Sequence, residues 1–204
     1  MESQTPKQFD TSKHFTVPII SGGEKRCVLR WPTDQEWAQR ARSLRIVTQQ
    51  LGRNRSQTDT VNEDRVNAEL FTKIRIDQDG PPFDEAEAAS AIRRLDRTLI
   101  TDVDRDGAHY RIHLRAAGCD LLHVLRIPTK AEELRYRKAA VHIFDLRRQV
   151  EARLNLEASQ ELYDAVHVAH EGYAGPVPIV HKEAALREML DQLQQLDEEA
   201  DPEF

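Results

Sequence analysis

Histidines and cysteines are the residues of this chain whose chemistry invites a search for a site. His167 and His170 lie three residues apart, and His109 and His113 lie four apart in a segment of β character. Neither pair has a cysteine or carboxylate at the spacing of a zinc site, and the HExxH pattern is absent. We therefore expect no metal site and no cofactor.

Nucleophilic catalysis is not indicated either. The two cysteines, Cys27 and Cys119, have no histidine at a spacing that argues for a catalytic pair, and GxSxG, P-loop and GxGxxG patterns are absent. Asp102–Gly107 resembles a calcium loop only loosely, because the glutamate that such a loop needs downstream is missing. The sequence predicts a protein that is not an enzyme.

Bulk composition sets wide limits. The chain has 204 residues, a net charge of −6 and 39% hydrophobic residues, which is typical of a globular protein and not of a general nucleic-acid binder. No apolar run approaches the length of a membrane span, and the first residues lack the apolar core of a signal peptide. With only two cysteines, the simplest expectation is a reduced, cytoplasmic protein without membrane contact.

A repeated hexapeptide predicts how the chain is organised. Residues 28–33 read Val-Leu-Arg-Trp-Pro-Thr and residues 124–129 read Val-Leu-Arg-Ile-Pro-Thr, with further matches on both sides. We predict a tandem duplication of one module, with copy 1 at residues 13–99, copy 2 at residues 100–196, and flexible tails at residues 1–12 and 197–204.

Each module is expected to be a β-hairpin followed by three helices, an α+β unit dominated by helix. Thr33 with Glu36, and Thr129 with Glu132, have the spacing of capping boxes, so each hairpin should lead directly into a helix. In copy 1 this helix is predicted from the spacing of Trp37, Ala41, Leu44, Val47 and Leu51, and in copy 2 from Leu134, Val141, Phe144 and Val150. A box at Thr60–Glu63 predicts the start of the second helix, whose partner spans residues 156–170, with Gly80 and Gly172 near the two ends. A third helix should begin after Asp84 in copy 1 and near Lys182 in copy 2. An extra strand is predicted at Leu99–Val103, before the second hairpin.

Basic residues recur on and after the first helix of each copy. Three interpretations stay open: a solvated helix face, a surface for phosphate backbones, or a surface that docks on an acidic protein or on this chain's own acidic segments. Arg30 and Arg126 are matched between the copies without an evident folding role, so they are our first choice for contact residues. The candidate interaction residues are Arg30, Arg126, Arg40, Arg42, Arg45, Arg53, Arg55, Arg135, Arg137 and Lys138.

The hairpin-to-helix junction resembles that of tail assembly chaperones of tailed bacteriophages and prophages. The resemblance rests on Phe15–Val17, Gly23, Val28–Thr33 and Glu36–Trp37, and in copy 2 on Tyr110–Ile112, Gly118 and Val124–Glu132. It implies a non-catalytic helper in the bacterial host cytoplasm or the virion, which holds tail proteins until assembly. Proteins are thus the expected partners, with nucleic acid as the alternative and a homo-oligomer as an open arrangement.

Overall fold

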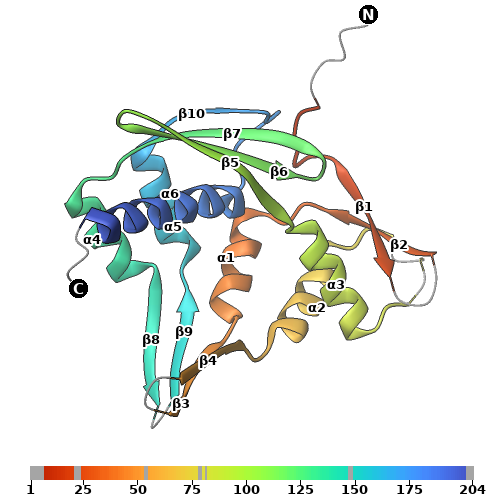
Figure 1. The fold of residues 1–204 in the computed structure, drawn as a ribbon. Helices are drawn as coiled ribbons and strands as arrows, with labels where there is room; N and C mark the ends of the chain where they lie inside the picture. The colour runs from red at the N-terminus through yellow and green to blue at the C-terminus, as the bar shows by residue number, and fades with distance from the viewer. Residues whose placement is uncertain are drawn as a thin grey trace, which may run out of the picture. The chain divides into compact units, whose positions relative to one another are not determined.

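The chain forms two units that are interleaved along the sequence. The computed structural model describes residues 7–20, 24–52, 55–77, 80, 82–146 and 149–200. Unit 1 consists of Met1–Asp10, Arg97–Tyr136 and Ser159–Phe204, and unit 2 of Thr11–Asp96 and Arg137–Ala158. Residues 137–158 of the second predicted module therefore belong to the same unit as most of the first. The described part contains six helices and three sheets, which confirms the α+β class (Figure 1).

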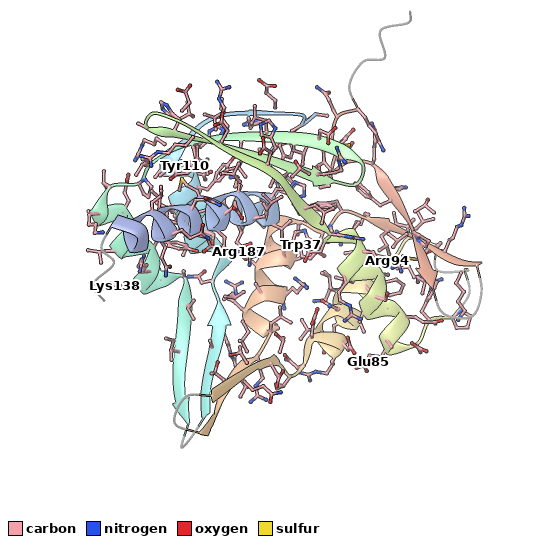
Figure 2. The ribbon with its side chains drawn as sticks, viewed as in Figure 1. Trp37, Glu85, Arg94, Tyr110, Lys138 and Arg187 are labelled. Carbon is pink, nitrogen blue, oxygen red and sulfur yellow. The ribbon has the colours of Figure 1, made fainter. Side chains whose placement is uncertain are left out.

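Unit 2 begins with a hairpin and a helix. Strand β1 (His14–Ile20) pairs antiparallel with β2 (Glu24–Arg30), and α1 (Asp34–Ser43) follows. Helices α2 (Glu63–Ile74) and α3 (Glu85–Leu95) pack on each other, and α3 also packs on β1. Trp37 on α1 (Figure 2) is fully buried, as are Leu29, Ile74 and Ile92, because each lies on the apolar side of its element.

A second sheet of unit 2 joins two hairpins that are distant in sequence. Strands β3 (Ile46–Gly52) and β4 (Arg55–Thr60) form one hairpin, and β8 (Val141–Leu146) and β9 (Gln149–Leu154) form the other. The order of the sheet is β4-β3-β9-β8, so β3 and β9 join the hairpins (Figure 1).

Unit 1 is built on a four-stranded sheet in the order β10-β7-β6-β5. Its strands are β5 (Thr98–Asp106), β6 (His109–Ala116), β7 (Cys119–Arg126) and β10 (His167–Glu171). Burial alternates along β6 and β7, so every second residue faces the core. This inner face packs on α6 (Ile179–Ala200), whose Leu186 and Met189 are fully buried; Tyr110, labelled in Figure 2, lies on it too. The chain passes from one unit to the other within α4 (Lys130–Ala139) and back within α5 (Leu156–Val166).

The predicted capping boxes are confirmed at the start of α1, and the same bonds form at the start of α4. The hydroxyl of Thr33 accepts from the Glu36 N–H at 3.2 Å, and the hydroxyl of Thr129 accepts from the Glu132 N–H at 3.3 Å. Asp84 caps α3 in the same manner. The predicted box at Thr60–Glu63 is wrong, because β4 extends through Thr60 and α2 begins after Asn62.

The predicted first helices are too long. In copy 1 the helix ends at Ser43, and Val47 and Leu51 lie in strand β3; in copy 2 it ends at Ala139, and Val141, Phe144 and Val150 lie in β8 and β9. The range of each predicted module thus contains a second hairpin that sequence analysis missed. The reason is that a few apolar residues do not distinguish a helix from a strand by spacing alone, and β-branched residues such as Ile46 and Val47 favour the strand.

The remaining differences concern the ends of elements. The predicted helix at residues 156–170 ends at Val166, and its last residues form β10. Gly80 and Gly172 do not end helices; Gly172 follows β10 with a φ of +88°. The extra strand is confirmed as β5, longer than predicted. Gly23 and residues 1–6 and 201–204 of the predicted tails lie outside the described residues. Among the described helices, none has the length and apolarity that a membrane span requires.

Candidate functional site

Arg30 has a folding role that sequence analysis did not find. Its two terminal nitrogens donate to the Glu36 carboxylate at 2.8 and 2.7 Å, and also to the backbone carbonyls of Trp31 and Lys73. Glu36 accepts in addition from the Thr33 N–H at 2.8 Å. One guanidinium therefore joins the end of β2, the start of α1 and the end of α2.

Arg126 makes the corresponding set of contacts in unit 1. Its terminal nitrogens donate to the Glu132 carboxylate at 2.9 and 2.7 Å, to the Ile127 carbonyl at 3.1 Å and to the Ala165 carbonyl at 2.9 Å. Hydrogen bonds from Arg126 hold the pKa of Glu132 at about 2, as those from Arg30 do for Glu36. These contacts explain the repeated arginine by folding, and its role as a contact residue stays a prediction.

The arginines of α1 are engaged with neighbouring groups. Arg40 donates to Asn67 at 2.7 Å and to Asp96 at 3.3 Å, and Arg42 pairs with Glu157. Arg45 is exposed, Arg53 lies outside the described residues, and only the backbone of Arg55 is described, in β4. Because Arg40 and Arg42 are balanced by carboxylates, they offer little uncompensated charge to a phosphate backbone.

The basic residues of α4 are more accessible. Arg135, Arg137 and Lys138 (Figure 2) are all exposed, and no residue of α4 is buried. The structure thus separates the two basic groups that sequence analysis treated alike. In the basic group of α1, Arg40 and Arg42 form hydrogen bonds with other residues of unit 2. The basic residues of α4 are exposed to solvent.

A buried network of histidine and tyrosine lies on the inner face of unit 1. His123 on β7 is fully buried, and its Nδ1 lies 2.6 Å from the Tyr163 hydroxyl, while its Nε2 lies 2.8 Å from the Tyr173 hydroxyl. Tyr173 in turn lies 3.2 Å from Nδ1 of His181 on α6. His167 stacks on Tyr163 with ring centroids 5.3 Å apart. The network joins β7, α5, α6 and the segment after β10.

The hydrogen-bond partners limit the possible directions of the donors. Each neutral imidazole has one donor and one acceptor nitrogen, so His123 donates to one of its two tyrosines and accepts from the other. Which nitrogen of His123 and of His181 carries the proton depends on the tautomer. Burial lowers the pKa of His123 and of His181 to about 3 and raises that of Tyr163 and Tyr173, so all four groups are neutral near pH 7.

Sequence analysis missed this network, although one signal was available. His123 occupies an inward position in the alternation of Cys119, Leu121 and Leu125 along β7. A histidine at such a position must be buried and must find partners. His167 and His170, which sequence analysis singled out, lie at the border of the network, with Nε2 and Nδ1 3.0 Å apart.

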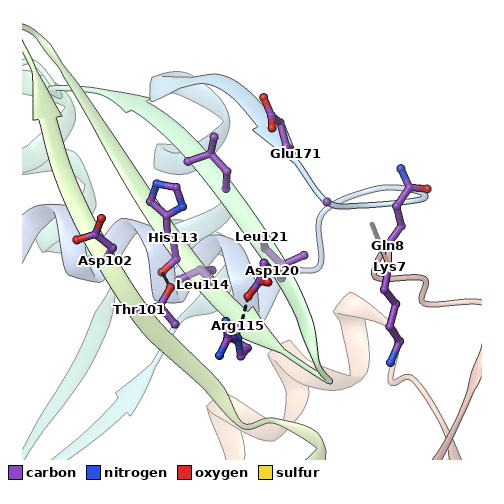
Figure 3. Close-up of a pocket in the computed structure, with 12 residues that line it drawn as sticks. Lys7, Gln8, Thr101, Asp102, His113, Leu114, Arg115, Asp120, Leu121 and Glu171 are labelled. Carbon is purple, nitrogen blue, oxygen red and sulfur yellow. Dashed lines mark hydrogen bonds and ion pairs between the residues drawn. The ribbon is translucent and has the colours of Figure 1, made fainter. Parts of the chain in front are cut away.

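A groove of about 680 Å³ lies in unit 1 (Figure 3). It extends over β5, β6 and β7 and reaches the segment around Gly172. His113, Arg115, Asp120 and Leu122 occupy positions of β6 and β7 that alternate with buried ones, so their side chains face outward. The residues that line it are Lys7, Gln8, Thr101, Asp102, His113, Leu114, Arg115, Asp120, Leu121, Leu122, Glu171 and Gly172.

Charges of both signs alternate along this groove. Arg115 pairs with Asp120 at 2.8 Å across the β6–β7 pair, and Asp102 lies opposite His113 across the β5–β6 pair. The ammonium of Lys7 donates to the Ala117 carbonyl at 3.3 Å. The side chains are exposed or half-exposed, so the groove offers hydrogen-bonding groups of both kinds to a ligand.

Within the described residues, no group of three or more histidine, cysteine, aspartate or glutamate side chains has a geometry that could hold a metal ion. No protein-family model matches this sequence, and comparisons with curated proteins and with solved structures find no similar chain. The resemblance to tail assembly chaperones thus stays a prediction from the sequence.

Proposed function

We propose that the protein is a non-catalytic interaction protein that binds a polypeptide segment of a partner protein in the groove of unit 1. The observation that carries the proposal is the groove's mixture of cationic Lys7 and Arg115 with anionic Asp102 and Glu171 around the apolar side chain of Leu122. A polypeptide offers donors, acceptors and apolar groups at similar spacing, so it can satisfy such a surface.

The same groups disfavour a nucleic acid in this groove. Its carboxylates repel phosphates, and Arg115 is already paired with Asp120. Among the described residues, the arginine-rich alternative therefore depends on the exposed basic residues of α4 and on Arg45. Duplex DNA that is shifted in a gel at low salt by the protein, but not by a variant with Arg135 and Lys138 changed to glutamine, would favour that alternative.

We also infer that the chain carries one module twice, as sequence analysis predicts. Support comes from the hairpins: His14 lies opposite Arg30 in the first, and His109 lies opposite Arg126 in the other. Each hairpin is followed by a helix, a second hairpin and two further helices, although β10 separates the last two helices of the second copy. Each arginine holds the capping glutamate. The narrower role as a phage tail assembly chaperone rests on the sequence resemblance alone.

Site-specific photo-crosslinking in extracts of the source cells tests the groove. A photoreactive amino acid in place of Leu122 is expected to label a discrete partner protein, because this position lines the groove. The matched control is the same residue in place of Glu161, which is exposed on α5 of the same unit and does not line the groove. Asp102→Lys combined with Glu171→Lys should reduce the labelling at position 122 by about tenfold, since about 1.4 kcal/mol of lost affinity has that effect. Equal labelling from both positions, or labelling unaffected by charge reversal, would contradict the proposal.

A further inference from the structure

The four-stranded sheet of unit 2 joins its two hairpins head to tail. β3 is the first strand of its hairpin, and it pairs antiparallel with β9, the second strand of the other, from Ile46 opposite Ala152 to Gln49 opposite Gln149. Each hairpin follows the first helix of its module and precedes the second. The contact is thus of the heterologous kind, in which two different edges of equivalent hairpins meet.

Such a contact leaves one edge of each kind unused. The edges of the sheet are β8, a first strand, and β4, a second strand. One first strand and one second strand already pair within the sheet, at β3 and β9, and the two free edges are again one of each kind. Within one chain the sheet keeps them at its opposite ends, whereas a second copy of the chain offers each edge its complement.

The backbone groups of both edges are arranged for pairing. Hydrogen bonds alternate along an antiparallel pair. The Asn155 N–H donates to the Ala140 carbonyl at 2.9 Å, so the alternation turns the N–H and C=O groups of Val141 and Ile143 away from β9. In the β3–β4 hairpin the Val61 N–H donates to the Arg45 carbonyl at 3.0 Å. By the same alternation, the N–H and C=O groups of Thr58 and Thr60 point away from β3.

The side chain at the centre of the β8 edge is apolar and exposed. Ile143 is 67% exposed, whereas Val47 on the interior strand β3 is only 7% exposed. On the β4 edge, residues 57–60 are exposed and contain neither lysine nor proline, the residues that commonly protect an edge. A strand added beside β8 would cover part of Ile143 and satisfy the outward backbone groups.

We propose that the protein self-associates by antiparallel pairing of β8 of one chain with β4 of a second copy of this chain. Two such contacts close a two-fold dimer, and successive single contacts build a ring or filament. The inference rests on the module repeat proposed above. It concerns edges of unit 2, so it stands or falls independently of partner binding in the groove of unit 1.

Proline substitutions on the two edges test this pairing. Because the N–H groups of Ile143 and Thr58 point outward, Ile143→Pro and Thr58→Pro each remove an edge donor and leave the hairpin ladders intact. The mass of the full chain is measured by sedimentation velocity from micromolar to near-millimolar concentration. The wild type should self-associate, and each variant alone should do so about tenfold more weakly or not at all, for a loss of roughly 1.4 kcal/mol.

Mixing the two variants is the decisive measurement. Ile143→Pro retains the β4 edge and Thr58→Pro retains the β8 edge, so the mixture should form a one-to-one dimer that neither variant forms alone. A wild type that stays monomeric throughout, or one variant that dimerises alone through a like pair of edges, would overturn the proposal. Far-UV circular dichroism checks the folding of each variant; if a proline variant unfolds, Ile143→Lys and Thr58→Lys replace the pair and must weaken wild-type self-association in the same way. The groove variant Asp102→Lys with Glu171→Lys serves as the control and should self-associate like the wild type.

Discussion

Mild acid is expected to destabilise unit 1 because two of its histidines are neutral and buried. His123 and His181 have pKa values of about 3 in the folded chain, compared with an ordinary value of 6.5 in an unfolded one. Below pH 6.5 the unfolded state therefore binds more protons than the folded state, so the free energy of unfolding falls as the pH falls. The decrease in the free energy of unfolding begins near pH 6.5 and grows by about 1.4 kcal/mol per pH unit for each histidine. It levels off below pH 3.

At pH 5 each histidine should have lowered the free energy of unfolding by about 2 kcal/mol, so both together lower it by about 4 kcal/mol. That is a large part of the roughly 5–15 kcal/mol that stabilises a typical domain. The lowered pKa of His167, which burial and neighbouring His170 cause, acts in the same direction. The carboxylates whose pKa lies at about 2, Glu36 and Glu132, contribute losses only below pH 4.5. Burial raises the pKa of Glu183 in the same unit, so this carboxyl acts in the opposite direction and offsets part of the histidine effect.

The aromatic residues allow the two units to be followed separately. The chain has four tyrosines and two tryptophans. All four tyrosines lie in unit 1 and both tryptophans in unit 2. Urea unfolding is measured at several pH values, with tyrosine absorbance reporting on unit 1 and tryptophan fluorescence on unit 2. The experiment gives the free energy of unfolding of each unit as a function of pH.

His123→Gln is the decisive variant, because glutamine keeps hydrogen-bonding groups beside Tyr163 and Tyr173 without a titrating ring. It should reduce the pH dependence of the tyrosine transition by about 1.4 kcal/mol per pH unit, since one strongly shifted histidine is lost. His109→Gln, an exposed histidine of the same sheet, is the control and should leave the dependence unchanged. A tyrosine transition that does not vary between pH 6.5 and 5, or an unchanged slope in His123→Gln, would refute the reasoning.

Three further predictions concern single residues. Gly172→Ala should lower the free energy of unfolding by about 2 kcal/mol or more, because φ is +88° and an added Cβ would clash with the Asp120 carbonyl oxygen. Gly107→Ala is the control and should cost only about 1 kcal/mol, because φ is +61° but the space around it is open. Equal losses for the two variants in urea unfolding would contradict this prediction. Arg126→Ala should lower the midpoint of the tyrosine unfolding transition by the equivalent of about 1 kcal/mol, since its ion pair is partly exposed; no change would mean that its contacts stabilise nothing. Burial raises the pKa of the Cys27 thiol to about 11, so iodoacetamide should alkylate it at pH 8 only after unfolding, and rapid alkylation of folded protein, read by mass spectrometry, would contradict its burial.

The sequence predicted those features whose causes are local. The capping glutamates, the hairpins β1–β2 and β6–β7 and the start of α3 depend on residues within a few positions of one another. The second hairpins were missed because their strands are stabilised by each other: β3 is helix-compatible by spacing, and only its pairing with β9 decides otherwise. His123 was missed for a related reason, since its partners Tyr163 and Tyr173 are brought to it by the fold. Arg30 was singled out without a folding role because the carbonyl that it reaches, at Lys73, lies on a distant helix.

The interleaving of the units has a consequence for folding during synthesis. β3 emerges from the ribosome early, but β9, its partner in the sheet, follows only after the greater part of unit 1's sheet has been made. Until then the β3 edge is open, and contacts so distant in sequence form slowly because the intervening chain must be ordered first. An expression fragment ending near residue 99 would leave the β3 edge without a partner, so such a fragment is expected to aggregate unless residues 137–158 are supplied with it.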